Sequence, residues 1–157
     1  HAIRDPLWSR GLGDVYKRQP QDSALFETMS IFDNVAFALN LRNWKEADIQ
    51  KRVYELAELM AITKLLDRLP FGVSGGESKR VALARALAAS PGVLCLDEPL
   101  SALDEQTHSE ICDLLVELHR EIDVTILHIT HSSAEAKRLG ETFIRLEDGQ
   151  LNEGSLE

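Results

Sequence analysis

Hydrophobic residues follow a helical period in the first half of the chain and form short unbroken runs in the second half. The spacing predicts one helix over about 30–42, with a break near Asn40, and a second over about 44–60. In the second helix, apolar residues recur at i, i+4, i+7 and i+11, namely Ile49, Val53, Leu56 and Met60. A short third element is expected at 65–69, where a following proline and glycine close it.

The second half alternates helix-forming stretches with short apolar runs. The runs at 93–96 and 124–129 have the length and composition of buried parallel strands. Helices are expected at 77–89, 105–121 and 133–139. A last strand at 143–146 precedes an Asp-Gly pair that is typical of a hairpin turn. This alternation predicts an α/β fold in which helices flank a parallel sheet, beside a helical subdomain.

Composition narrows the class of protein. The 157 residues are enough for one domain with a sizeable core. The formal net charge of −9 argues against the chain binding nucleic acid or an anionic membrane by itself. No apolar run approaches the roughly 20 residues of a membrane-spanning helix, so we expect a cytoplasmic location. Cys95 and Cys112 lack metal-ligand spacing and are expected to be buried free thiols.

A glycine pair marks the first candidate site. Ser74, Gly75 and Gly76 precede a helix-forming run, where free backbone N–H groups and the positive end of the helix dipole suit an anionic oxygen. Taken alone, such a turn is more often only a turn. Asp97 and Glu98 mark the second site, because they follow an apolar strand whose carboxyl end is where α/β sheets place their ligands. Taken alone, this pair is often a helix cap.

Both motifs in this order, one helix apart, resemble the nucleotide-binding subunit of ATP-binding cassette (ABC) transporters. The stretch VSGGE is similar to the family signature LSGGQ, with Val73 and Glu77 as mild departures, and VLCLDEP is similar to its Walker B strand. The resemblance extends from about Pro20 to about Ser155 and implies a partial P-loop NTPase fold that binds ATP and Mg²⁺. It also implies that Ser74, Gly75, Gly76 and Glu77 contact the γ-phosphate of nucleotide held by an opposing subunit.

The same resemblance implies roles for other residues. Gln21 is similar to the Q-loop glutamine, which reaches magnesium and the attacking water, although a solvated loop residue is the plainer reading. Asp97 would hold magnesium through a water, and Glu98 would be the general base. His131 resembles the switch histidine that contacts the γ-phosphate. Asp104 resembles the D-loop aspartate at the dimer interface and also fits the N-cap of the helix that follows.

One motif of this chemistry is missing from the sequence. Phosphoryl transfer in P-loop ATPases uses a G-x-x-x-x-G-K-[ST] cradle, and the sequence contains none. Residues 1–19 match nothing expected upstream of the Q-loop, so we expect an unrelated or artefactual segment there and a partial ABC ATPase domain over 20–157. Within that domain, the helical subdomain is expected at about 30–90 and the sheet-bearing part at about 91–157. This truncated chain is expected to be inactive alone.

Three functions remain open. The first is the ATPase subunit of an importer; the SALD and ITHSSAEA segments are most similar to importers of oxyanions such as molybdate, or of polyamines or sugars. Its implied partners are a second nucleotide-binding subunit, membrane permease subunits and a substrate-binding protein, with the chain on the inner face of the membrane. The second is a soluble ABC ATPase of DNA repair or translation. The third is a non-catalytic remnant or interaction module.

Overall fold

The computed structural model describes residues 16–19, 25–147 and 149–154. Its helices are α1 (Ile31–Leu41), α2 (Glu46–Leu59), α3 (Gly75–Ala88), α4 (Glu105–Glu121) and α5 (Ser133–Leu139), with a 3₁₀ turn, η2 (Thr63–Leu65). Its strands are β1 (Tyr16–Gln19), β2 (Val93–Asp97), β3 (Thr125–Ile129), β4 (Phe143–Glu147) and β5 (Gln150–Gly154). The α/β fold expected from the alternating pattern is confirmed.

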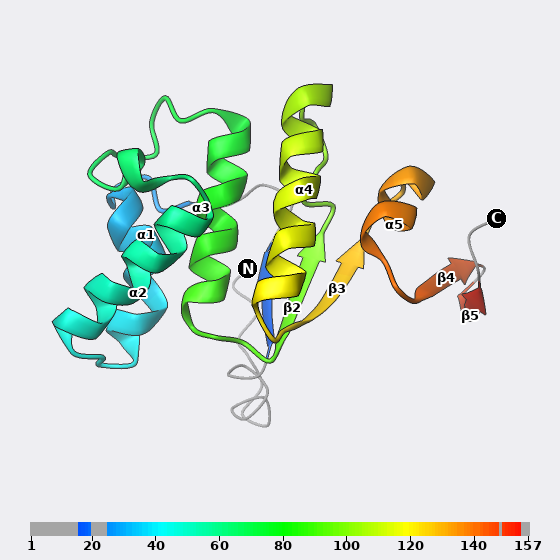
Figure 1. Cartoon of the computed structure of the whole chain (residues 1–157), viewed down its shortest axis with the longest axis horizontal. Coiled ribbons are helices and arrows are strands. Elements are labelled where there is room, and N and C mark those ends of the chain that lie inside the picture. Colours follow the sequence, from blue (N-terminus) through cyan, green and yellow to red (C-terminus); the bar gives the residue numbers. More distant parts are fainter. Residues whose placement is uncertain (1–15, 20–24, 148, 155–157) are drawn as a thin grey trace.

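A parallel sheet forms the centre of the molecule. Its strand order is β1-β2-β3, and β2 pairs with both neighbours in parallel. Helices α3 and α4 lie over one face of this sheet (Figure 1). Leu94 and Leu96 of β2 are buried, whereas Leu127 and Ile129 of β3 are about half exposed. The apolar core therefore lies between the sheet and the helices on one side.

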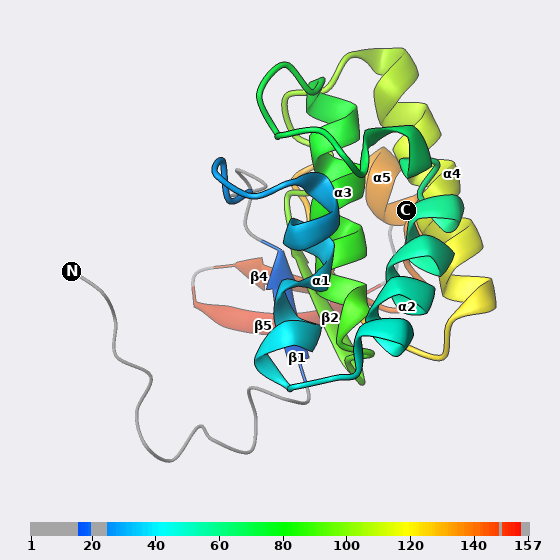
Figure 2. The same cartoon turned by 90° about the vertical axis from the view of Figure 1, so that its left-hand side faces the viewer.

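A helical part stands at one end of the sheet, where α1, α2 and α3 pack together (Figure 2). The stripe predicted for the second helix is buried as expected, and Val53 of α2 is fully buried. Ser30 caps α1 by accepting a hydrogen bond from the Asp33 backbone N–H. Helix α1 continues to Leu41, so the break expected near Asn40 does not occur.

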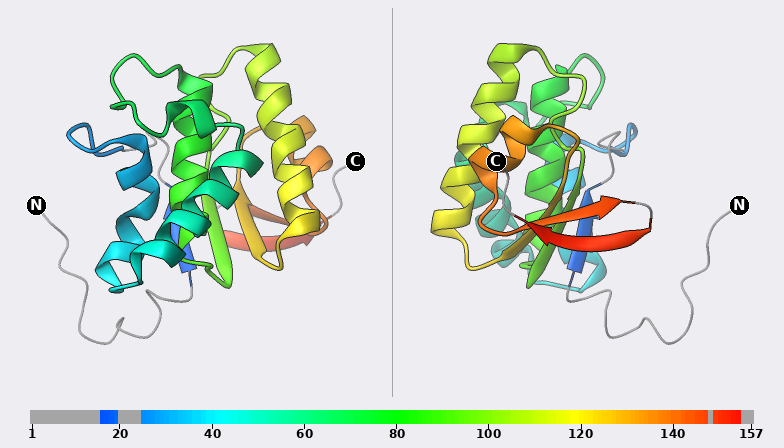
Figure 3. Two further views of the ribbon diagram at one scale, coloured as in Figure 1. Left: turned by 60° about the vertical axis from the view of Figure 1, so that its left-hand side comes forward. Right: turned by 90° about the vertical axis from the view of Figure 1, so that its right-hand side faces the viewer.

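The antiparallel hairpin β4–β5 lies at the other end, beyond α5 and far from α1 and α2 (Figures 1 and 3). Gly149 occupies the turn with φ of +76°, a left-handed conformation that glycine adopts without steric cost. The Asp-Gly prediction of a hairpin is therefore confirmed. Both cysteines are free; Cys112 is buried and Cys95 is half-buried.

Four residues of the segment expected to be unrelated or artefactual, 1–19, take part in the sheet. Tyr16–Gln19 form β1 and pair in parallel with Val93–Leu96 of β2. Four residues are too few for a period of two to be recognised, and a strand is defined as much by its neighbour as by its own sequence. Backbone hydrogen bonds to β2 define this strand, whereas the side-chain pattern of the segment did not indicate one.

Asn34 organises the loop that leads into α1. Its side chain is fully buried and donates hydrogen bonds to the backbone carbonyl oxygens of Phe26 (3.1 Å), Met29 (3.2 Å) and Ser30 (2.9 Å). Its Oδ1 accepts from the Phe26 backbone N–H at 2.8 Å. One amide thus satisfies four backbone groups, which is why a polar residue is tolerated on the buried side of this helix.

We expect Asn34→Ala to lower the free energy of unfolding by about 2–3 kcal/mol, because it removes the side-chain partner of the Phe26 N–H and of the Met29 carbonyl oxygen; the Phe26 and Ser30 carbonyl oxygens keep backbone donors. Urea denaturation followed by circular dichroism measures the change. Asn40→Ala is the matched control, since Asn40 is an exposed amide on the same helix, and it should change stability by less than about 0.5 kcal/mol. Equal effects of the two substitutions would contradict the role of Asn34.

Candidate functional site

The carboxyl ends of β2 and β3 form the first part of the site. In the parallel register Asp97 lies opposite Ile129, so the residues that follow each strand leave the sheet side by side. The Glu98 backbone N–H then donates to the Ile129 carbonyl oxygen at 3.0 Å. Figure 1 shows that these strand ends and the N-terminal ends of α3 and α4 face the same end of the molecule.

Glu98 and His131 meet at this edge. Glu98 Oε1 lies 3.0 Å from His131 Nε2, and the side chains are 30% and 89% exposed. The pair is therefore open to solvent and to a ligand. Glu98 has φ of +45°, an uncommon conformation for a residue with a side chain. The Ser101 backbone N–H (3.2 Å) and hydroxyl (2.9 Å) both donate to the Glu98 carbonyl oxygen and hold this geometry.

The start of α3 forms the second part. Ser74 is the N-cap and Gly75 and Gly76 open the helix, as the sequence predicts. Ser74 and Glu77 form a capping box: the Glu77 backbone N–H donates to Ser74 Oγ, and the Ser74 backbone N–H donates to Glu77 Oε2 at 2.9 Å. The Ser74 hydroxyl also donates to this carboxylate, at 2.9 Å. These bonds, first from the Ser74 backbone and then from its side chain, lower the pKa of Glu77.

The start of α4 lies directly against α3. Asp104 caps α4 by accepting hydrogen bonds from the Thr107 backbone N–H at 3.0 Å and hydroxyl at 2.6 Å, and these bonds lower its pKa, the hydroxyl first. The methyl group of Thr107 packs on Gly76, where any added Cβ would collide with it. A Cβ added at Gly75 would instead touch Leu103 at an ordinary 3.7 Å. Gly76 is thus required for helix contact, independently of any ligand.

The remaining predicted residues are placed as follows. Asp97 ends β2 and is half-buried. Gln21 lies outside the described residues. Arg80, a basic residue of α3 close to this site in sequence, contacts the Glu110 carboxylate at 3.3 Å. Among the described residues, no group of three or more His, Cys, Asp or Glu side chains could hold a metal ion, so Asp97 is a single carboxylate rather than part of a cage.

Several contributors to the site carry no strong motif. Ser101 and Thr107 act through short-range hydrogen bonds and, for Thr107, a methyl contact, none of which has a sequence signature. Thr130 and Glu135 support the loop around His131, since the Thr130 hydroxyl donates to the Glu135 carboxylate. The spacing Ser132-x-x-Glu135 at the start of a helix was the available signal, because it matches a capping motif.

The fold is similar to a solved structure, cbiO1 from Clostridium perfringens, described as part of the ABC transporter complex cbiONQ. The TM-score is 0.86 and the identity 32%, over 93% of this chain and 59% of that chain. The fold is that of part of the nucleotide-binding domain of an ABC ATPase, a class of proteins that hydrolyses ATP. A family model described as ABC transporter matches residues 8–101, and the chain belongs to that family.

Curated relatives are import ATP-binding proteins. The molybdate/tungstate import ATP-binding protein WtpC of Thermococcus kodakarensis is 44% identical over 93% of this chain and 43% of its own length. The WtpC protein of Archaeoglobus fulgidus is 45% identical over 94% of this chain and 59% of its own length. A sulfate/thiosulfate import ATP-binding protein, CysA of Thermosynechococcus vestitus, is 42% identical over 97% of this chain and 44% of its own length. The chain thus spans about half the length of these relatives.

In the described part of the chain, no helix is both long enough and apolar enough to cross a membrane. The family match also begins within the first nineteen residues, upstream of the boundary expected at Pro20. This start agrees with the pairing of β1 to β2 in the sheet.

We expect Gly76→Ala to lower the free energy of unfolding by about 1–3 kcal/mol, because the added methyl group collides with the Thr107 methyl group. Thr107→Ser removes that methyl group and keeps the hydroxyl that bonds Asp104. The double variant should therefore recover most of the loss, which denaturant unfolding of all four proteins measures. Strict additivity of the two substitutions would show that the α3–α4 contact is not the reason for glycine at 76.

Proposed function

We propose that this chain is part of the ATP-binding subunit of an ABC importer, and that Glu98 and His131 form its hydrolytic centre. The 3.0 Å contact between Glu98 Oε1 and His131 Nε2 carries the proposal. Glu98 accepts a proton from the attacking water, and His131 orients that carboxylate and donates toward the γ-phosphate. Because both side chains are exposed, a water molecule and the γ-phosphate of a nucleotide could reach them at this edge of the sheet.

Asp97 fits a magnesium ion. Mg²⁺ commonly keeps several waters and binds through one or two carboxylates together with substrate phosphates. A single half-buried carboxylate at the end of β2, one residue before the base, matches that pattern. When bound, the ion would neutralise charge on the transferred phosphoryl group. Asp97 would hold it through a water, and Gln21 would reach it from the preceding loop.

The start of α3 would act on nucleotide held by a second subunit. Gly75 and Gly76 direct backbone N–H groups out of the helix end, whereas the Ser74 hydroxyl and N–H are already bonded to Glu77. A γ-phosphate would therefore meet the glycine N–H groups first. Asp104, at the neighbouring helix end, would face the same interface. The G-x-x-x-x-G-K-[ST] cradle that the sequence does not contain would be supplied elsewhere in the assembled protein.

We expect the purified chain to hydrolyse ATP no faster than its Glu98→Gln variant. Joining residues 16–157, which keep β1, to the P-loop segment of the Thermococcus relative should create turnover that Glu98→Gln lowers by about 10²–10⁴-fold, because the base is removed while the shape is kept. Phosphate release and nucleotide-binding titrations measure the two effects separately, and ATP binding should persist in the variant.

The control in the same fusion is Glu141→Gln. Glu141 also lies beside an imidazole, His119, at 3.2 Å, but on the exposed surface away from the strand ends. This substitution should leave turnover unchanged. Undiminished hydrolysis by the Glu98→Gln fusion would exclude Glu98 as the base and with it the proposed hydrolytic centre.

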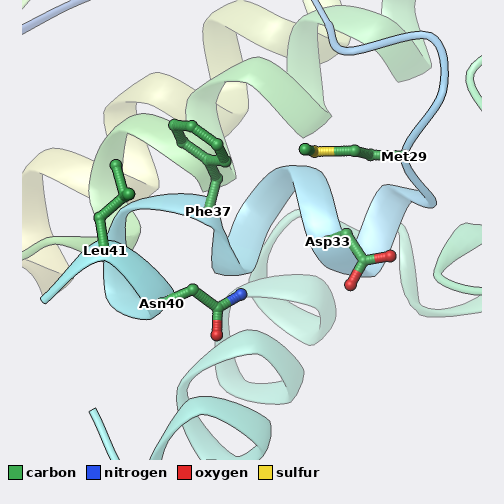
Figure 4. A pocket seen from close by; sticks show the side chains of 5 residues that line it. All are labelled: Met29, Asp33, Phe37, Asn40 and Leu41. Carbon is green, nitrogen blue, oxygen red and sulfur yellow. The ribbon is translucent and has the colours of Figure 1, made fainter. Parts of the chain in front are cut away.

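The permease would dock on the outer side of α1. A pocket of about 410 Å³ is lined there by Met29, Asp33, Phe37, Asn40 and Leu41. Figure 4 shows Phe37 and Leu41 standing along one side of the helix and Asn40 on another. Leu41 is 69% exposed, so an apolar side chain is available for contact beside the hollow. An amphipathic helix of the permease would bury this surface, which would hold the chain on the inner face of the membrane.

The transported solute is proposed to be an oxyanion of the molybdate type, delivered by a substrate-binding protein on the other side of the membrane. Support comes from the relatives, of which two are molybdate/tungstate import proteins and one a sulfate/thiosulfate import protein. The solute would not touch this chain. Its identity would be set by the permease and the binding protein.

We expect Leu41→Glu to lower co-purification of the fusion with the permease subunits of a molybdate/tungstate importer by about tenfold or more, because it places a charge in a buried apolar contact. Leu151→Glu is the matched control: Leu151 is 72% exposed but lies on the hairpin at the opposite end of the molecule. Equal loss with both variants would argue against docking on α1.

A further inference from the structure

The loop that carries His131 is closed by a compact set of hydrogen bonds. The Thr130 hydroxyl donates to the Glu135 carboxylate and accepts from the Ser132 backbone N–H at 3.0 Å. The Ser132 hydroxyl accepts from the Glu135 backbone N–H at 3.3 Å. These bonds fix the residues on both sides of His131 while its own ring remains 89% exposed. The direction of that ring therefore depends on the loop backbone.

Glu135 is a buried carboxylate with no part in the proposed hydrolytic centre. It is 6% exposed, and its Oε1 lies 3.7 Å from Nε2 of both His108 on α4 and His128 on β3. At that distance neither imidazole makes a good hydrogen bond, and His128 Nε2 is buried without a hydrogen-bond partner. Burial lowers the pKa of His128 and favours its neutral form. The hydroxyl of Thr130 contacts the other carboxylate oxygen, Oε2, and donates to it.

We propose that Glu135 is a positioning residue for His131, acting through the hydroxyl of Thr130. The inference deepens the proposed function, because it matters for hydrolysis only if His131 serves the centre described above. A buried carboxylate is costly unless it is hydrogen-bonded, so the Thr130 hydroxyl is held firmly in one orientation. Because the Thr130 hydroxyl proton is directed to Glu135, the hydroxyl oxygen presents its lone pairs to the Ser132 N–H. The turn at His131 then has a fixed conformation, in which the His131 ring contacts Glu98.

A simpler alternative is that Glu135 only anchors α5. Arg138 of α5 already contacts Asp113 of α4 at 2.5 Å and Ser109 at 3.4 Å, so the helix has a second attachment to α4. Loss of Glu135 should therefore loosen the His131 loop more than it detaches α5. The two alternatives therefore predict different outcomes for the contact between the His131 ring and Glu98: it is lost without Glu135 if Glu135 positions the loop, and kept if Glu135 only anchors α5.

The test compares Thr130→Val with Thr130→Ser in the isotopically labelled full chain by NMR. Valine keeps the shape and removes the hydroxyl, whereas serine restores it. In Thr130→Val we expect the nuclear Overhauser contact between the His131 ring and the Glu98 side chain to fall at least threefold. Exchange of the Ser132 amide should accelerate about fivefold or more, as expected for one lost hydrogen bond. Thr130→Ser should retain both signals.

Glu135→Ala should reproduce the Thr130→Val result, and Glu135→Gln, which keeps an acceptor oxygen, should lie between it and the native chain. Glu141→Gln, at the surface pair with His119, is the control and should change neither signal. If Thr130→Val does not fold, the proposal is tested with Glu135→Gln and Glu135→Ala instead, by the same His131–Glu98 contact and the same exchange rate of the Ser132 amide. A native-like His131–Glu98 contact in the folded Thr130→Val or Glu135→Ala chain would overturn the proposal.

The NMR result does not depend on hydrolysis, so it separates this proposal from the proposed function. In the P-loop fusion, Thr130→Val should lower kcat while KM for ATP stays within about twofold, because the change acts on the catalytic loop rather than on nucleotide binding. A lost His131–Glu98 contact with unchanged kcat would support Glu135 as the positioning residue and count against His131 as part of the hydrolytic centre.

Discussion

The parallel pairing of β2 with β3 is the constraint on which the site depends. Its register sets Asp97 beside Ile129, and a slip by one residue would send the following side chains to opposite faces of the sheet. Because the register holds, Glu98 and His131 leave adjacent strand ends and meet, although 32 residues separate them in the chain. The helices α3 and α4 bury one face of these strands and so keep the pairing in place.

A second constraint is the close contact between the start of α3 and the start of α4. Gly76 allows α4 to approach α3 closely, and Asp104 fixes the Thr107 side chain that fills the space. The two sequence motifs that implied contact with an opposing subunit are therefore parts of one packed unit. A movement of the α4 start cannot leave the α3 start unchanged, because the interface has no free volume at that point. This mechanical link relates the two motifs more directly than their spacing in the sequence suggests.

Sequence reasoning predicted the elements well because most carry a clear period, as in Val53 and its neighbours on α2. It also predicted that Glu98 and His131 each follow the carboxyl end of a strand, but that the two strands are neighbours became known only from the sheet order. It did not find β1, whose order comes from β2, nor the buried amide of Asn34, whose partners are backbone atoms without a sequence signature. Hydrogen-bond partners such as Thr130 for Glu135 depend on exact loop geometry, which hydrophobic patterning does not encode.

The backbone of Glu98 has a consequence for how this protein can change over time. Its left-handed φ of +45° disfavours every residue with a Cβ, and glycine would relieve the tension at once. Selection for a robust fold alone would therefore drift toward glycine at this position and erase the carboxylate. If Glu98 is the base proposed above, its conformation sets the stability of the fold against its chemistry at a single peptide unit. A lineage that no longer needed hydrolysis would be expected to lose this side chain among the first.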